Sequence, residues 1–201
     1  MVTLANGRER DGTAIFAQGL QSLGYKLRKE TAFDTVWIAI GESSASLIER
    51  ALQSGINLRK ACDKSVSISL DETTTREDIT ALWQVFAAPG QALPSFEAFE
   101  KGVEPLIPAA LRRSSDFLTH PVFNTHHSET SMLRYIRALS DKDLALDRSM
   151  IPLGSCTMKL NATSEMIPIT WPEFAQPHPF APADQLQGYA LLDEQLRAWL
   201  C

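Results

Sequence analysis

Residues 65–87 read SVSISLDETTTREDITALWQVFA, and they decide the fold class of the first part of the chain. The first six residues alternate polar and apolar side chains, which predicts a strand over residues 65–70. Threonines at 73–75 can cap a helix over residues 76–87. The apolar positions of that helix recur at helical spacing: Ile79, Leu82, Trp83 and Phe86. A strand followed by a capped amphipathic helix predicts a sheet with helices packed on it.

Two more helices are expected upstream of this stretch, over residues 12–23 and 45–53. The first is apolar along one face and stops at Gly24, and the second stops at Gly55. Ser43 or Ser44 can cap the second helix, since serine side chains accept a hydrogen bond from a helix N-terminus.

Two further strands complete the predicted layer, over residues 33–40 and from residue 56 to 59. The order of helices and strands predicts a small α+β layer with an antiparallel sheet, within the broad α/β class. The polar turn between the last strand and the last helix contains Ser69, Asp71 and Thr73. These residues are expected to cap the N-terminus of that helix and not to form a binding site.

A proline- and glycine-rich segment follows and predicts the domain organisation. Residues 1–88 are expected as a small α+β domain, residues 89–113 as a linker, and residues 114–201 as the incomplete start of a second unit. Helices are expected in that second unit over residues 129–139 and from residue 182 or 184 to the last residue. That last helix has no stop signal, so we expect the chain to be a fragment of a larger polypeptide.

The composition excludes several classes of protein. The chain has 201 residues, a net charge of -5 and a pI of about 5.4, which argue against nucleic acid or an anionic membrane as the main partner. No run approaches the roughly 18 apolar residues of a membrane-spanning helix, and no signal peptide is expected. Cys62, Cys156 and Cys201 are odd in number and widely spaced, so reduced thiols are expected.

Residues 154–161, GSCTMKLN, concentrate hydrogen-bonding and nucleophilic side chains in a stretch that is apolar without being periodic. Cys156 could be a reactive thiol, because Gly154 and Lys159 are close in sequence, or a buried inert one. Lys159 is the one amine of this stretch, and it is not assigned as a lysine that tethers a cofactor. An ordered connecting loop is the alternative reading of the whole segment.

Three histidines lie close together in sequence: His120, His126 and His127. Adjacent histidines on a loop rarely point at one ion, and no cysteine or carboxylate follows at zinc spacing, so no metal site is expected. His126 and His127 are expected at a helix N-terminus, in contact with solvent.

Three stretches together resemble one enzyme family. The three stretches are residues 117–130 (FLTHPVFNTHHSET), 133–155 (LRYIRALSDKDLALDRSMIPLGS) and 150–189 (MIPLGSCTMKLNATSEMIPITWPEFAQPHPFAPADQLQGY). They resemble the P-protein of the glycine cleavage system, glycine dehydrogenase (decarboxylating). Residues 55–86 resemble the small domain of fold-type I enzymes that bind pyridoxal phosphate.

The resemblance implies glycine decarboxylation with pyridoxal 5'-phosphate as cofactor and transfer of the aminomethyl group to the lipoyl group of the H-protein. It implies a homodimer or an assembly of two halves, in the cytoplasm of a bacterium or in a mitochondrial matrix. The family's cofactor lysine lies in a His-Lys motif, which this chain lacks, so the chain alone is expected to be inactive.

The resemblance also implies residues close to substrate or cofactor. They are Ser155, Cys156, Thr157, Lys159, Asn161, His126 and His127. Within that set, Ser155, Thr157 and Asn161 could donate hydrogen bonds, and Lys159 could face the glycine carboxylate.

Two other functions stay open. One is a non-catalytic binding or regulatory subunit that pairs with a separate chain bearing the cofactor. The other is a thiol enzyme centred on Cys156, for which fast alkylation of Cys156 relative to Cys62 at neutral pH would be the mark.

Overall fold

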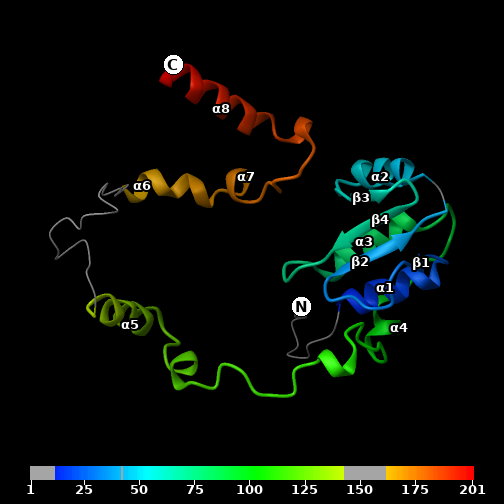
Figure 1. Ribbon diagram of the computed structural model, residues 1–201, viewed down its shortest axis with the longest axis horizontal. Coiled ribbons are helices and arrows are strands. Elements are labelled where there is room, and N and C mark those ends of the chain that lie inside the picture. Colours follow the sequence, from blue (N-terminus) through cyan, green and yellow to red (C-terminus); the bar gives the residue numbers. More distant parts are fainter. Residues whose placement is uncertain (1–11, 42, 143–161) are drawn as a thin grey trace. The chain divides into compact units, whose positions relative to one another are not determined.

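A computed structural model describes residues 12–41, 43–142 and 162–201, and the chain divides into two compact units, residues 1–114 and 115–201. The first unit holds a sheet with helices packed on it, and the second consists of helices and turns (Figure 1). No helix among the described residues is long and apolar enough to cross a membrane.

The sheet of the first unit is antiparallel throughout, in the strand order β1-β2-β4-β3. The strands are β1 (Lys26–Leu27), β2 (Thr35–Ala39), β3 (Arg59–Cys62) and β4 (Ser65–Ser69). At its centre Val36 pairs with Ile68 and Ile38 with Val66, and all four side chains are buried. One face of the sheet therefore carries the hydrophobic core, as the alternation of strand residues predicts.

The described part of the first unit has the α-helices α1 (Gly12–Ser22), α2 (Ser44–Gln53), α3 (Arg76–Phe86) and α4 (Phe96–Glu100), and a 3-10 turn at Ala109–Leu111. Trp83 of α3 is fully buried, and its indole N–H donates to the carbonyl of Phe16 in α1 at 3.1 Å. A side chain on Gly19 of α1 would overlap the Trp83 ring, so glycine allows the two helices to approach.

The capping predictions are confirmed for two helices. Ser43 accepts a hydrogen bond from the backbone of Ala45 at the start of α2. Thr75 and Asp78 form a capping box at the start of α3. Because these side chains satisfy backbone N–H groups that have no partner within the helix, they fix where each helix begins.

The polar turn before α3 is structural in part, as expected. Asp71 accepts hydrogen bonds from the backbone and hydroxyl of Thr73 and from the hydroxyl of Thr74. These bonds, led by the Thr73 hydroxyl, hold the pKa of the Asp71 carboxyl below its usual value. The expectation that Ser69 is a cap is wrong: its hydroxyl bonds Thr35 across the sheet at 2.7 Å.

The strand expected from residue 56 begins only at Arg59. The backbone of Ile56 donates to the carbonyl of Ala51, so it belongs to the turn that ends α2, where Gly55 has a φ of 74°. The two-residue strand β1 and the short helix α4 were not expected, because neither is long enough to show a period.

Residues 89–113, expected as a linker, fall within the first unit. Phe96 of α4 is buried in the core, and its ring lies 6.5 Å from that of Trp83. Arg76 of α3 pairs with Glu100 of α4 at 2.9 Å and lies over the Phe96 ring. The part of this segment around α4 is therefore held by specific contacts with α3.

The second unit contains α5 (Glu129–Ser140), α6 (Thr163–Met166), α7 (Pro172–Ala175) and α8 (Gln187–Leu200), with 3-10 turns at Pro121–Asn124, Ile167–Thr170 and Ala183–Gln185. Residues 163–175 form short helical turns. Pro168 and Pro172 lie in the first turn of their helices, where proline needs no N–H partner. None of this unit's described residues is buried.

Candidate functional site

The candidate site in the described residues lies at the N-terminus of α5. Ser128 caps this helix by accepting a hydrogen bond from the Ser131 backbone at 3.2 Å. The chain before the cap returns over the helix, so that the His126 ring stacks on Tyr135 with 4.2 Å between ring centroids and 15° between planes. His126, Ser131 and Tyr135 are all half-buried, whereas their neighbours in sequence are exposed.

The Ser131 hydroxyl makes a second contact that orients the His126 ring. Nδ1 of His126 and Oγ of Ser131 are 3.0 Å apart, within hydrogen-bonding distance. A serine hydroxyl can donate or accept a hydrogen bond, so this contact is compatible with either tautomer of the neutral imidazole. Stacking and hydrogen bond together orient the ring, and Nε2 is the atom through which it could exchange a proton with a ligand.

The other two histidines have separate local contacts. Nε2 of His127 lies 2.7 Å from the carbonyl oxygen of Asn124, and Nδ1 of His120 accepts from the Val122 backbone at 3.2 Å. The structure therefore does not bring His127 together with His126. Among residues 12–41, 43–142 and 162–201, no group of three or more His, Cys, Asp or Glu side chains could hold a metal ion.

Five of the sequence-predicted site residues lie outside the described residues: Ser155, Cys156, Thr157, Lys159 and Asn161. Their assignment stays a prediction, as do those of His126 and His127. Ser131 and Tyr135 were not expected as part of the site. The available signal was their i, i+4 spacing on the predicted helix, which places both on one face.

The described residues do not by themselves form a site for pyridoxal phosphate. Such a site needs a lysine within a cavity to hold the cofactor covalently. Every described lysine is exposed: Lys26, Lys29, Lys60, Lys64, Lys101 and Lys142. No chemical step through that cofactor can be assigned to these residues.

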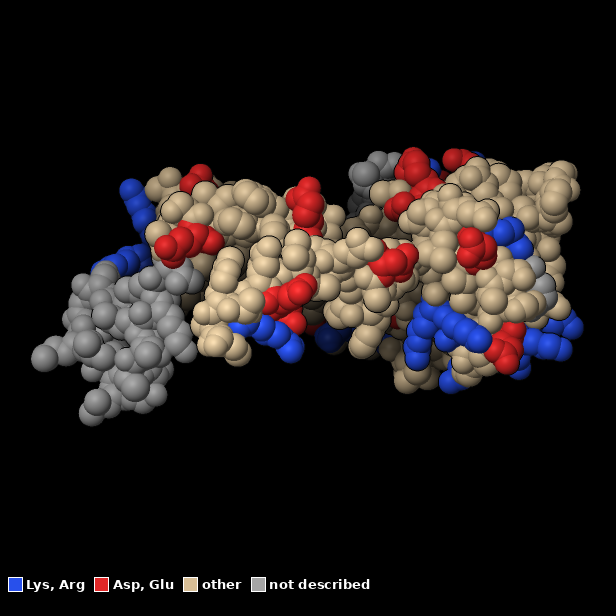
Figure 2. All heavy atoms as spheres, turned by 90° about the horizontal axis from the view of Figure 1, so that it is seen from above, with Lys and Arg blue, Asp and Glu red and all other residues tan. Residues whose placement is uncertain are grey.

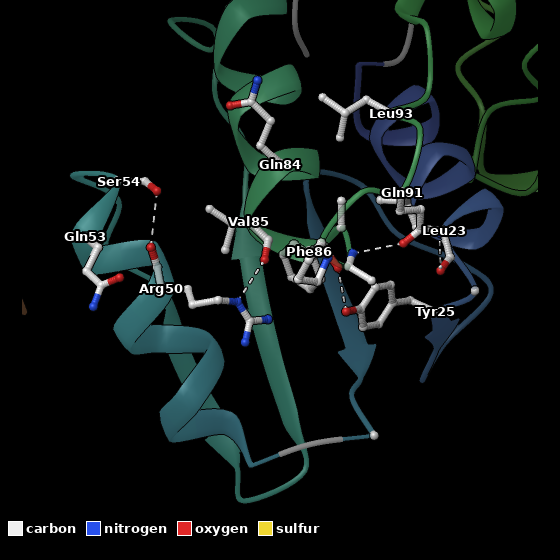
Figure 3. Close-up of a pocket in the computed structure, with 15 residues that line it drawn as sticks. Leu23, Tyr25, Arg50, Gln53, Ser54, Gln84, Val85, Phe86, Gln91 and Leu93 are labelled. Carbon is white, nitrogen blue, oxygen red and sulfur yellow. Dashed lines mark hydrogen bonds between the residues drawn. The ribbon is translucent and has the colours of Figure 1, made fainter.

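The first unit carries an open pocket of about 880 Å³ where α1, α2 and α3 end (Figure 3). Two of its side chains hold the last carbonyls of α3. Arg50 of α2 donates to the carbonyl of Val85 at 3.3 Å, and the Tyr25 hydroxyl donates to that of Phe86 at 2.7 Å. The Gln91 amide donates to the carbonyl of Leu23 beyond α1. These contacts join three helix ends and give Arg50, Tyr25 and Gln91 structural roles.

Comparison with known proteins identifies related sequences. Residues 2–86 match the family model described as "Glycine cleavage system P-protein". A protein of Variovorax paradoxus named "Glycine dehydrogenase (decarboxylating)" is 65% identical over 94% of this chain and 19% of its own length.

Two further relatives carry the same name. That of Cupriavidus metallidurans is 56% identical over 94% of this chain and 19% of its own length. That of Paraburkholderia xenovorans is 55% identical over 93% of this chain and 20% of its own length. The chain spans about one fifth of the length of the curated relatives it matches.

Proposed function

We propose that the chain is part of a glycine cleavage system P-protein and takes part in the decarboxylation of glycine. The aminomethyl group would pass to the lipoyl group of an H-protein. The observation that carries the proposal is the 65% identity to a glycine dehydrogenase (decarboxylating), which extends over 94% of the chain.

The proposed cofactor is pyridoxal 5'-phosphate, bound in a fold-type I enzyme. The small antiparallel sheet with helices on one face is compatible with a small domain of such an enzyme. Pyridoxal phosphate supplies an electron sink for bond cleavage at the α-carbon of an amino acid. Because every described lysine is exposed, the covalent attachment is proposed to lie outside the described residues.

We propose that the N-terminus of α5 contributes His126 to the surroundings of substrate or cofactor. Its ring is oriented by Ser131 and Tyr135, as a group that transfers a proton must be. His127 and the five residues between 155 and 161 are further candidates, and a homodimer or two-half assembly is the proposed state. The location is proposed to be the cytoplasm of a bacterium or a mitochondrial matrix.

A second candidate function is a non-catalytic chain that pairs with another polypeptide bearing the cofactor. It is favoured by the apolar side chains that the second unit exposes on α5 and α8. Leu133 and Ile136 of α5 are more than half exposed, at 58% and 53%, and Trp199 of α8 is 76% exposed. Faces of this kind are normally covered by another part of a protein.

A chimera separates the two functions. The chain would replace the matching segment of the Variovorax paradoxus relative, and release of carbon dioxide from carboxyl-labelled glycine would be followed with pyridoxal phosphate and lipoylated H-protein. An active chimera is expected. A chimera that folds and binds cofactor but releases no carbon dioxide would favour the non-catalytic function.

Two histidine variants of that chimera test the role of α5. His126→Ala is expected to lower turnover by about 100-fold, the lower range for loss of a proton-transferring group. His120→Ala is the matched control, because its Nδ1 accepts from the nearby Val122 backbone, and its turnover is expected to stay unchanged. Equal activity of the two variants would remove His126 from the mechanism.

A further inference from the structure

One face of the sheet lies opposite the hydrophobic core, and we call it the open face. Several of its side chains are exposed, among them Arg28, Trp37 and Arg59. The register places Trp37 opposite Ser67, and Arg59 opposite Ser67 on the other side. The backbone N–H of Arg28 donates to the carbonyl of Trp37 at 2.7 Å, which continues the pairing beyond β1. Arg28, Trp37, Ser67 and Arg59 thus form one row across all the strands, which we call the open row.

Both ends of the open row are cationic. Arg28 and Arg59 are exposed, at opposite edges of the sheet. Three strand spacings separate them, so their backbones are about 14 Å apart. Lys26, paired with Ala39, adds a third exposed cation on this face.

Carboxylates are few on this face. Among the described residues, Asp34 accepts from the Thr35 hydroxyl at one end of β2, and Asp63 pairs with Lys60 at 2.7 Å beyond β3. The positions paired across the face are otherwise basic, aromatic, small or hydroxylic. The chain as a whole has a net charge of -5, and Figure 2 shows acidic and basic side chains both present on the side it views. The open face is therefore a local concentration of positive charge.

Trp37 is positioned as an anchor at the centre of the open row. Its indole N–H donates to Ser65 Oγ at 2.9 Å, which fixes the ring, and 39% of the residue is exposed. Of the serines on the neighbouring strand β4, Ser65 and Ser67 are buried and Ser69 is exposed, so the Trp37 ring is the large exposed side chain at this part of the face. Tryptophan and arginine are among the residue types that contribute most to the binding energy of protein interfaces.

We propose that the open face docks an acidic partner polypeptide, whose carboxylates pair with Arg28 and Arg59 while an apolar side chain packs on Trp37. Charge complementarity selects this occupant. The two guanidinium groups can each bind a carboxylate in a bidentate manner, and they require carboxylates spread over about 14 Å. This surface belongs to the first unit, and the proposal does not depend on the proposed enzymatic activity.

Binding of a fluorescently labelled decaglutamate peptide to the full chain tests the proposal. Anisotropy titration is expected to show binding that weakens as salt rises. The double variant Arg28→Glu with Arg59→Glu is expected to weaken binding roughly tenfold or more, since it replaces both attractions by repulsions. With a second peptide that carries one leucine among its glutamates, Trp37→Ala is expected to weaken binding at unchanged net charge.

The matched control is Lys101→Glu with Lys142→Glu, which changes the net charge by the same amount at exposed positions outside the sheet. Unchanged binding in this control, with circular dichroism of every variant like that of the original chain, supports the open face as the site. Equal weakening in both double variants, or no measurable binding of decaglutamate by the original chain, overturns the proposal. Tighter binding of an oligothymidylate of equal length overturns it in favour of a nucleic acid.

Discussion

Gly19 of α1 lies directly against the indole of Trp83 in α3, where any side chain on residue 19 would overlap the ring. The same indole donates to the carbonyl of Phe16, one turn earlier in α1. The two contacts set how closely the helices approach and hence how the core closes over the sheet.

Gly19→Ala is therefore expected to destabilise the first unit by about 1–3 kcal/mol, the usual cost of overpacking a core. This outweighs the gain of about 1 kcal/mol that alanine brings inside a helix. Urea unfolding followed by circular dichroism measures the difference. Gly41→Ala is the control, because a Cβ there meets no atom within 4 Å. A Gly19→Ala protein at least as stable as the original would contradict the packing described.

Tyr25→Phe removes the hydroxyl that donates to the Phe86 carbonyl but keeps the ring, which packs edge-on against Phe86 with 5.1 Å between centroids. The expected loss is about 1 kcal/mol, typical of one hydrogen bond. Tyr25→Ala removes the ring contact as well and should cost clearly more. Equal urea midpoints for Tyr25→Phe and the original chain would show that water replaces the hydroxyl.

Thr75→Ala breaks the capping box of α3, because the Thr75 hydroxyl accepts from the Asp78 backbone. We expect a loss of about 1 kcal/mol in the free energy of unfolding. Thr75→Ser keeps the hydroxyl and is expected to retain most of the stability. If the two variants unfold at the same urea concentration, the cap does not contribute through its hydroxyl.

Asp71 makes stability depend on pH. Its pKa is lowered in the folded state, chiefly by the Thr73 hydroxyl, so its contribution is present above the unfolded pKa of about 3.9 and is lost as pH falls through the folded value. Asp71→Asn is expected to flatten the decline of stability in that acidic window and to leave its slope near neutral pH unchanged. Thermal melts at a series of pH values measure both slopes. An unchanged acidic slope in the variant would assign the decline to other carboxylates.

Cys62 is expected to be the more reactive of the two described thiols. The hydrogen bond with Ser65, at 2.9 Å, lowers the pKa of Cys62, so more thiolate is present at a given pH. Alkylation by iodoacetamide, resolved by mass spectrometry, should be faster at Cys62 near neutral pH. Ser65→Ala should move the pH profile of Cys62 to higher pH. Identical profiles with and without Ser65 would contradict this role.

The candidate site was predictable only in part. The sequence THHSET drew attention to His126 and His127 together, yet the structure gives them different partners, Ser131 and Asn124. Tyr135 was missed, because stacking depends on how the chain turns back over α5, and sequence spacing does not specify that path.

The sequence by itself determined the elements that rest on local physics. Periodic apolar residues, a serine cap and a capping box predicted α2 and α3, because each signal lies within a few residues of the helix it specifies. Tertiary structure alone decided the strand order, the start of β3 at Arg59 and the burial of Phe96 beneath α3 and α1. Those features depend on contacts between residues far apart in sequence, whose free energy exists only when the core is assembled.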